Sequence, residues 1–491
     1  MEVAKLNMLK ANHLNQKYAL EELVLRKYPE TIQRLTERIA GYEKDIAIAV
    51  AHPKPAEGFV GMEILGTVYD DKEAAGKAII DACTTMTGSD AVFLGHVGEI
   101  ELGASALAGI YYLAIYMLGF GFSIGLQVMV ARRNGEQDYK ETGKTFFQGL
   151  FFLLGLAIFL YLLIHTVSPF ILKKLIVSSD IYRAVILYLD WRSFGLLFSF
   201  PFLAIRSFLV GITHTKALSW AAAIAVLINI PLNFYLIFTR ELGISGAAIA
   251  SSLAEMGSFM MLSFYMWIRL DKEKYGLRPV YNGNLLIKVL KLSTWSMLHA
   301  LISVAPWFLF FVSIEHLGKI ELAISNITRS VSAIFFVIAN SFALTTGSLV
   351  SNAIGAGEGK TLFSICSKIL KLGYTIGFPL VAIALLCNRW IIGFYTSNEL
   401  LIQLAFAPFV VMLLNYTFAL PGYVYLNAVG GTGKTQMTFL FQVTTTAIYL
   451  VYLYWLCRYT QAPLAIYLTA EYVFVILLAT QSIFYLKKKH Y

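Results

Sequence analysis

GLQVMVARRNGE, residues 125–136, has a counterpart 222 positions later in GSLVSNAIGAGE, residues 347–358. Each stretch is a Gly, nine residues and then Gly-Glu. IRSFLVGITHTK at 205–216 and VYLNAVGGTGKT at 424–435 form a second pair, at an offset of 219. Two matches at nearly one offset predict two homologous helical halves. Parallel repeats of this kind are a transporter architecture, with the substrate path between the halves.

The composition is that of a polytopic membrane protein. The chain has 491 residues, of which 58% are hydrophobic and 14% charged, and its mean hydropathy is +0.66. Soluble domains average about 45–50% apolar and about 25% charged residues. The four cysteines show no CxxC pairing, so we expect no structural metal, and the pattern gives no reason to expect a cofactor.

Eleven stretches are long and apolar enough to cross a bilayer, which takes about 20 residues. An incomplete twelfth lies before Gly95. The fold class is therefore an all-α polytopic membrane protein with two pseudo-symmetric six-helix lobes, the first helix being truncated. The predicted spans are 104–130, 145–168, 187–210, 217–238, 245–268, 293–315, 322–350, 366–387, 403–427, 437–457 and 463–486.

Loop charge predicts the orientation. Eighteen Lys and Arg residues fall on one side of this layout, including those in 131–145, 269–291 and 487–489, and seven fall on the other. Positive residues concentrate in cytoplasmic loops. We therefore expect a multi-pass protein of the bacterial inner membrane with both termini in the cytoplasm. The same bias explains the net charge of +9 without a nucleic-acid partner.

Residues 1–87 differ from the rest and are expected to form a small soluble α/β-like segment. The stretch PAEGFVGMEILGTVYDDKEAAGKAI loosely resembles part of the helicase–methyltransferase polypeptides of mobile elements. A fusion or a misjoined reading frame near residue 88 accounts for the change. The expected domains are this segment, a first lobe over 88–280 and a second lobe over 281–491.

AVGGTGKT, residues 428–435, fits the loose form of a phosphate-binding loop. Such a loop functions after a strand and before a helix, but a membrane helix precedes this one. Its first-half counterpart, GITHTK, has no such pattern. We interpret it as a tight turn with Lys434 facing anionic head groups, and we expect no enzyme activity.

Several motifs together resemble the multidrug and toxic compound extrusion family. They are SDAVFLGHVGEIELGASALAG, GLQVMVARRNGE, RSFLVGITHTK and NIPLNFYLIF followed by GISGAAIASS, and they cover roughly residues 89–486 in the family's order. The resemblance implies a monomeric antiporter that exports organic, often cationic compounds across the bilayer by alternating access, in exchange for H⁺ or Na⁺. A flippase or exporter of lipid-linked or other amphipathic metabolites is the alternative within the same superfamily.

The resemblance also implies a cation-coupling site in the first lobe. The family places a carboxylate at Asp90 and a hydroxyl at Ser251. Asn229 and Asn233 lie four residues apart on one helix face, and Pro231 between them loosens the backbone. Many relatives carry Asp where this chain has Asn233, so one charge fewer is available here. For Asp90 the alternative is an inert interfacial group, for the asparagines interhelical hydrogen bonding, and for Ser251 helix packing.

Glu255 and His299 are further candidates inside predicted spans. A carboxylate within a membrane span is a site hypothesis by default, although Glu255 can instead pair with Arg192 or Arg206. Asp190 and Arg192 are expected to pair with each other near the outer surface. A histidine side chain can titrate near neutral pH, which makes His299 a candidate proton relay, the alternative being a hydrogen-bonded buried histidine.

Overall fold

The computed structural model describes Leu94 and residues 99–489, except for 177, 316, 318, 396–398 and 461. The chain divides into two compact units, Met1–Lys72 and Glu73–Tyr491, and every described residue belongs to the second. The predicted segment 1–87, the truncated first helix apart from Leu94, and the candidate Asp90 therefore lie outside the described residues.

The described part of the chain consists of helices and turns. Its α-helices are α5 (Glu99–Gly135), α6 (Tyr139–Thr166), α7 (Ser168–Leu175), α8 (Ser179–Arg192), α9 (Leu196–Gly211), α10 (Lys216–Phe234), α11 (Gly243–Arg269), α12 (Gly283–Ser303), α13 (Ala305–Glu315), α14 (Lys319–Gly355), α15 (Leu362–Leu386), α16 (Asn388–Tyr395), α17 (Glu399–Leu414), α18 (Tyr416–Gly431), α19 (Thr435–Tyr459), α20 (Leu464–Tyr467) and α21 (Thr469–Lys488).

Eleven helical segments among the described residues are long and apolar enough to cross a membrane, which confirms the predicted number. The sixth of the eleven spans differs from its prediction. It occupies Gly283–Ser303 rather than 293–315, so Lys288 and Lys291 lie in a helix and not in a loop. The chain breaks at Val304 because Pro306 opens a new helix, α13, close to its first position, where a missing N–H costs little.

Burial follows the pattern of a protein in lipid. Large apolar side chains are exposed, among them Phe170 at 74% and Leu386 at 84%. Small polar side chains such as Ser123, Thr145 and Ser207 are fully buried. In water such an exposed apolar surface would be unfavourable, whereas small and hydroxyl-bearing residues at helix contacts are typical of membrane bundles.

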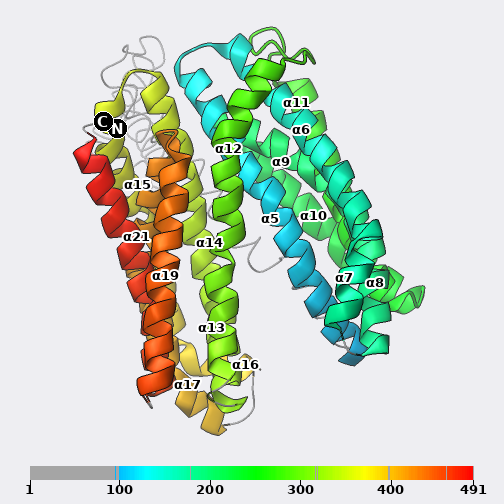
Figure 1. The fold of residues 1–491 in the computed structure, drawn as a ribbon, viewed down its shortest axis with the longest axis vertical. Coiled ribbons are helices and arrows are strands. Elements are labelled where there is room, and N and C mark those ends of the chain that lie inside the picture. The colour runs from blue at the N-terminus through cyan, green and yellow to red at the C-terminus, as the bar shows by residue number, and fades with distance from the viewer. Residues whose placement is uncertain are drawn as a thin grey trace, which may run out of the picture. The chain divides into compact units, whose positions relative to one another are not determined.

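The order of elements repeats between the two halves, as the sequence repeat predicts. In the first half, α6 is followed by the eight-residue α7 and then by α8 and α9. In the second half, α15 is followed by the eight-residue α16 and then by α17 and α18. In Figure 1, α6, α9, α10 and α11 group on one side, α15, α19 and α21 on the other, and α5, α12 and α14 run between them. We refer to α5–α11 and α12–α21 as the first and second lobes.

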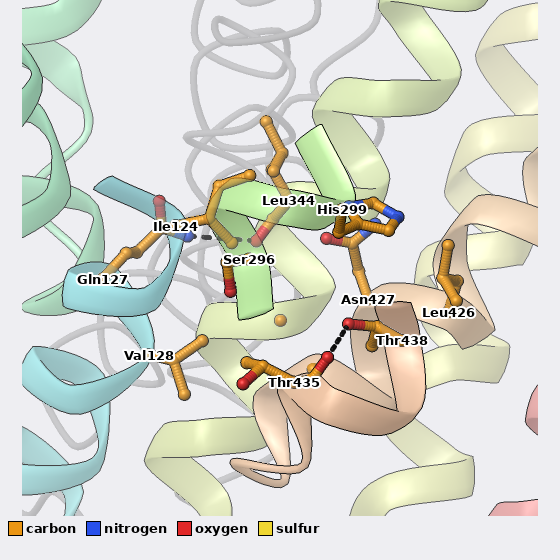
Figure 2. A pocket seen from close by; sticks show the side chains of 12 residues that line it. Ile124, Gln127, Val128, Ser296, His299, Leu344, Leu426, Asn427, Thr435 and Thr438 are labelled. Atoms are coloured by element: carbon orange, nitrogen blue, oxygen red, sulfur yellow. Dashed lines mark hydrogen bonds between the residues drawn. The ribbon is translucent and has the colours of Figure 1, made fainter. Parts of the chain in front are cut away.

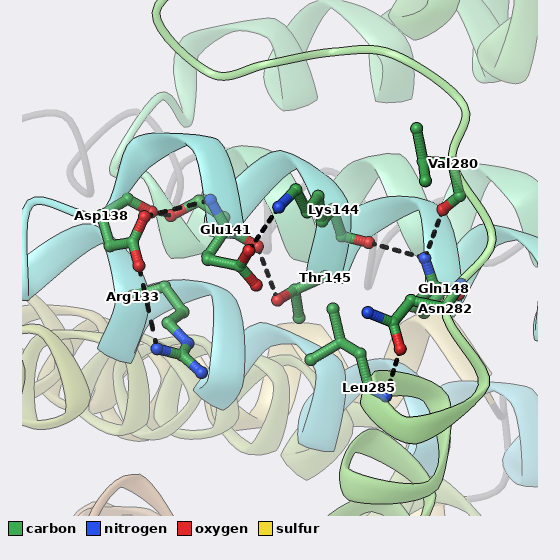
Figure 3. A network of polar contacts seen from close by, with 10 residues as sticks. Arg133, Asp138, Glu141, Lys144, Thr145, Gln148, Val280, Asn282 and Leu285 are labelled. Carbon is green, nitrogen blue, oxygen red and sulfur yellow. Dashed lines mark hydrogen bonds and ion pairs between the residues drawn. The ribbon is translucent and has the colours of Figure 1, made fainter.

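The linker between the lobes, residues 270–282, is hydrogen bonded to α6 (Figure 3). The buried Gln148 amide donates to the Val280 carbonyl at 2.7 Å, and its oxygen accepts from the Asn282 N–H at 2.9 Å. Asn282 in turn caps α12 by accepting from the Leu285 N–H. Gly143 allows the Tyr275 carbonyl to approach the helix closely. Burial raises the pKa of the phenol of Tyr275, a linker residue, and nearby Tyr139 and Asp271 raise it further, so this ring stays neutral as it packs against Tyr139 and Phe208.

Candidate functional site

The two lobes meet along α5 and α14 at the end of the helices that carries the 270–282 linker, here called the linker end. Gln127 of α5 donates to Ser348 Oγ at 2.8 Å and to the Leu344 carbonyl at 3.2 Å. Asn134 donates to Asn352 Oδ1 at 2.8 Å, and Ser351 donates to the Val128 carbonyl at 2.7 Å. The Gln127–Ser348 and Ser351–Val128 bonds are buried and the other two are partly buried, so together they close this end.

The closure is pseudo-symmetric. Gly135 of α5 lies directly against the backbone of Asn352, and Gly355 of α14 lies against the backbone of Arg132. A shift of 220 residues, two fewer than the offset of the first pair of sequence motifs, converts position 132 into 352 and 135 into 355, in agreement with the ends of α5 and α14. The two contacts therefore exchange with one another. That is the behaviour of an isologous interface, and it places the two motifs of the sequence repeat on opposite sides of one contact.

The glycine-rich turn after α18 contributes to the same closure. The Arg132 guanidinium donates to the carbonyls of Thr432 at 3.0 Å and Gly431 at 3.4 Å. The turn connects two membrane helices, α18 and α19. Its predicted interpretation as a tight turn, and not a nucleotide site, therefore holds, and its carbonyls bind an arginine of the other lobe.

A small cavity of about 30 Å³ lies next to this contact, between the lobes. Five helices line it: α5 with Gln127, α12 with Ser296 and His299, α14 with Leu344, α18 with Asn427, and α19 with Thr435 and Thr438. Figure 2 shows Gln127 and His299 converging on the cavity from opposite lobes, with Thr435 and Thr438 below them. The volume suits water, since one water needs about 10–15 Å³ of such space.

Two buried polar atoms at this cavity have no hydrogen-bond partner within the described part of the chain: Gln127 Oε1 and His299 Nε2. Gln127 is 1% exposed. Unsatisfied buried groups are costly, so both atoms favour an occupant that can hydrogen bond. The structure thus places His299 at a polar cavity between the lobes, with Gln442 of α19 adjacent to the ring.

Asn229, Asn233 and Ser251 come together in the first lobe. All three are buried. Asn233 Nδ2 donates to Asn229 Oδ1 at 3.1 Å, and Asn229 Nδ2 donates to Ser251 Oγ at 3.1 Å. A π-helical turn, Tyr235–Thr239, follows Asn233, and such turns often occur at functional sites. The predicted fourth member, Asp90, lies outside the described residues, so the structure brings together the three polar members only.

Glu255 forms a buried ion pair with Arg192 and not with Arg206. Arg192 Nη2 lies 2.6 Å from Glu255 Oε1, and the two side chains are 9% and 11% exposed. The guanidinium also stacks 4.1 Å above the Tyr112 ring and donates to its hydroxyl at 3.1 Å. The predicted pairing of Arg192 with Asp190 is wrong, because α8 turns these residues in different directions and Asp190 instead faces His165 at 3.7 Å.

The second lobe contains a matching cluster that the sequence interpretation missed. Arg329 of α14 pairs with Glu471 of α21, and these side chains are 9% and 16% exposed. The guanidinium stacks 4.1 Å from the Phe310 ring, and the Tyr449 hydroxyl donates to Glu471 at 3.4 Å. Glu471 lies inside the predicted span 463–486, and that position in a membrane helix was the signal that could have revealed it.

Two lobes with eleven membrane-spanning segments between them in the described part of the chain, closed against each other at one end and each holding a buried Arg–Glu pair, define a membrane transporter of the two-lobed, parallel-repeat class. The comparison with family models gives the family itself: residues 82–235 and 296–455 match the MatE model. The chain belongs to the MatE family of multidrug efflux transporters, which are not enzymes and need no cofactor, and the resemblance seen in the sequence is thereby confirmed.

Proteins of similar sequence include multidrug resistance proteins, in agreement with this family. The multidrug resistance protein NorM of Aliivibrio fischeri is 23% identical over 404 residues, which is 79% of this chain and 86% of that protein. The probable NorM of Idiomarina loihiensis is 23% identical over 332 residues, 65% of this chain and 71% of that protein. Protein DETOXIFICATION 48 of Arabidopsis thaliana is 24% identical, covering 68% and 64% of the two chains.

Solved structures share the fold. A MATE transporter in the straight conformation superposes with a TM-score of 0.79 at 15% identity, covering 89% of this chain and 99% of that one. The outward-facing conformation of a multidrug resistance MATE family transporter gives a TM-score of 0.76 at 17% identity, covering 85% and 94%. At these identities the likeness supports the architecture alone.

Proposed function

We propose that this protein is a secondary active antiporter that exports organic, often cationic compounds in exchange for H⁺ or Na⁺ by alternating access. The observation that carries the proposal is the isologous contact of Arg132 and Gly135 with Asn352 and Gly355. A contact that closes one end between two pseudo-symmetric lobes provides the closed gate that alternating access requires. Residues 88–280 and 281–491 act as the two moving halves.

The positive residues at the linker end support placing that end in the cytoplasm of a bacterial inner membrane, together with both termini. Arg133, Lys140, Lys272, Lys274 and Arg278 all lie there. With the cytoplasmic side closed, the described arrangement corresponds to a state that releases its substrate outward. The chain works as a monomer, because one chain already supplies both lobes.

Asn229, Asn233 and Ser251 form the coupling site of the first lobe together with Asp90. The two amides and the hydroxyl, linked to one another by hydrogen bonds, carry neutral oxygens of the kind that suits a hard cation, and the carboxylate supplies the negative charge. Glu255 adds a second carboxylate to this lobe, held by Arg192. His299 serves as a proton relay in the second lobe, because its ring faces a polar cavity between the lobes.

The test is ethidium efflux from cells under separately imposed pH and Na⁺ gradients. It compares this chain with a version in which residues 1–87 are replaced by an apolar half-helix. Efflux that an ionophore abolishes supports the antiporter. The proposal is wrong if neither version moves ethidium under either gradient. Accumulation of a lipid-linked intermediate on gene deletion, without drug sensitivity, supports the flippase alternative instead.

A further inference from the structure

One face of α19 is polar and buried through most of its length. Its buried polar residues are Thr435, Thr438, Gln442, Thr445, Thr446 and Tyr449. They recur every three or four positions, so they line one side of the helix. The opposite side is exposed and apolar, with Leu440, Ile448 and Val451. Threonines alone are common where membrane helices pack, but Gln442 and Tyr449 add larger polar groups to the same face.

This polar face is long enough to cross a large part of the membrane. The fourteen helical steps from Thr435 to Tyr449 rise about 21 Å at about 1.5 Å each, a large part of a hydrocarbon core about 30 Å thick. Successive polar groups lie about 5 Å apart along the axis, a gap that one water molecule can bridge. Gln481 of α21 extends the row, since it accepts from Thr444 at 3.0 Å and donates to Thr445 at 3.5 Å.

One end of the face opens on the cavity between the lobes. Thr435 and Thr438 line that cavity with His299, and Gln442 is adjacent to the same ring. Buried atoms along the way lack partners among the described residues, namely Thr446 Oγ1 and Ser482 Oγ in addition to His299 Nε2 and Gln127 Oε1. These unpartnered atoms are independent signs that water or a proton carrier occupies the row.

The other end reaches an ionisable cluster. The Tyr449 hydroxyl contacts Glu471, which Arg329 of α14 holds in an ion pair. Tyr423 of α18 is also close enough to Glu471 and Arg329 to interact with both electrostatically. The groups that face Glu471 from its packed helices are therefore one arginine and two tyrosines. Ionisable side chains thus lie at both ends of the row.

We propose that the polar face of α19 is a proton pathway in the second lobe, linking the Glu471–Arg329 pair to the His299 cavity. The inference rests on the antiporter function proposed above and names H⁺ as an ion that drives it. A proton arriving as hydronium protonates Glu471 and weakens its ion pair with Arg329. It then passes through bridging waters to His299, and at each step one O–H or N–H bond breaks as the next forms. An imidazole is no ligand for Na⁺, which favours oxygen.

The test uses the full chain in proteoliposomes with a trapped pH dye and ethidium as substrate. Tyr449→Phe and Gln442→Leu should slow ethidium-coupled proton movement by about a hundredfold, the low end of what a positioned proton-transfer group contributes. Equilibrium binding of ethidium should change less than about twofold, which is under 0.4 kcal/mol. Tyr454→Phe is the matched control, because Tyr454 is on the same helix and 65% exposed. The double variant Arg329→Gln/Glu471→Gln, which leaves no lone buried charge, should lose proton movement while remaining monodisperse.

Wild-type proton movement in Tyr449→Phe and Gln442→Leu overturns the pathway. So does a wild-type protein that transports ethidium on a Na⁺ gradient and not on a pH gradient, although the antiporter then stands. If the wild-type protein moves no ethidium on either gradient, the antiporter function itself fails, and the two failures are thus told apart.

Discussion

Asn134 of the first lobe donates a hydrogen bond of 2.8 Å to Asn352 of the second, across the contact that closes the linker end. Asn352 also donates to the Gly211 carbonyl at 3.0 Å. This amide therefore holds α14 against both α5 and α9. Alternating access requires that these bonds break in every cycle, since the lobes cannot separate at this end while they persist.

Covalently joining these positions should stop transport. In a background without the four native cysteines, Asn134→Cys/Asn352→Cys treated with a short bifunctional thiol reagent is expected to lose ethidium efflux. Each single-cysteine variant with the same reagent is the control and should keep efflux. Full transport by the cross-linked protein, with linkage verified by mass spectrometry, would show that this end does not open.

Gly135 and Gly355 should be intolerant of a methyl group. The added Cβ of alanine would overlap the backbone of Asn352 or Arg132, and such overpacking costs about 1–3 kcal/mol. We expect Gly135→Ala and Gly355→Ala to favour separation of the lobes at the linker end. The readout is faster maleimide labelling of a cysteine at Ser348, which is 2% exposed in the closed arrangement.

Gly155→Ala provides the matched control for these substitutions. Gly155 is also inside a helix, α6, but an added Cβ meets nothing within 4 Å. Its labelling rate at position 348 should equal that of the parent. Equal labelling in all three variants would contradict the role given to the two interface glycines.

The buried and exposed ion pairs should differ in their effect on stability. Glu255→Gln leaves Arg192 buried without its carboxylate, and breaking a buried pair in this way costs about 3–5 kcal/mol. Arg192→Gln/Glu255→Gln should cost clearly less than the two single changes together. Thermal unfolding of the detergent-solubilised protein measures this.

Glu399→Gln is the comparison, because Arg389 and Glu399 form an exposed pair at 3.2 Å with 74% and 67% exposure. Surface pairs contribute about 0–1 kcal/mol, so little change in unfolding temperature is expected. If Glu255→Gln is as mild as Glu399→Gln, the Arg192 pair is not buried in the working protein.

The architecture could be predicted from the sequence because hydropathy identifies each membrane helix separately, and because the repeat is visible in the sequence itself. The offset of about 220 residues predicted two lobes, and GLQVMVARRNGE marked the helix end where they meet. The sequence could not predict which side chains form ion pairs with one another. Glu255 had two candidate arginines in the same lobe, and only the structure shows that Arg192, directly before the 3-10 turn Ser193–Gly195, is the one that faces it. Glu471 was overlooked because its arginine lies 142 residues away in sequence.

Gln148 should control the linker between the lobes. It is fully buried and contacts the linker through both its nitrogen and its oxygen. Gln148→Ala removes both bonds, leaving the Val280 carbonyl and the Asn282 N–H unsatisfied, so residues 270–282 should be released from α6. Limited trypsin digestion should then cleave faster at Lys272, Lys274 or Arg278. Lys144→Ala, which removes only a partly exposed pair with Glu141, should leave cleavage unchanged.

Asn233→Asp should increase the dependence of transport on Na⁺. The carboxylate would stand beside the oxygens of Asn229 and Ser251, where Asn233 now donates to Asn229 at 3.1 Å. A negative charge among neutral oxygens strengthens binding of a hard cation. We expect the Na⁺ concentration for half-maximal ethidium efflux to fall by about tenfold, equivalent to about 1.4 kcal/mol. Ser258→Ala, on α11 but bonded to the Ala221 carbonyl, should not change it. An unchanged Na⁺ response in Asn233→Asp would mean that the amide cluster packs helices and binds no ion, and would leave coupling to the second lobe alone.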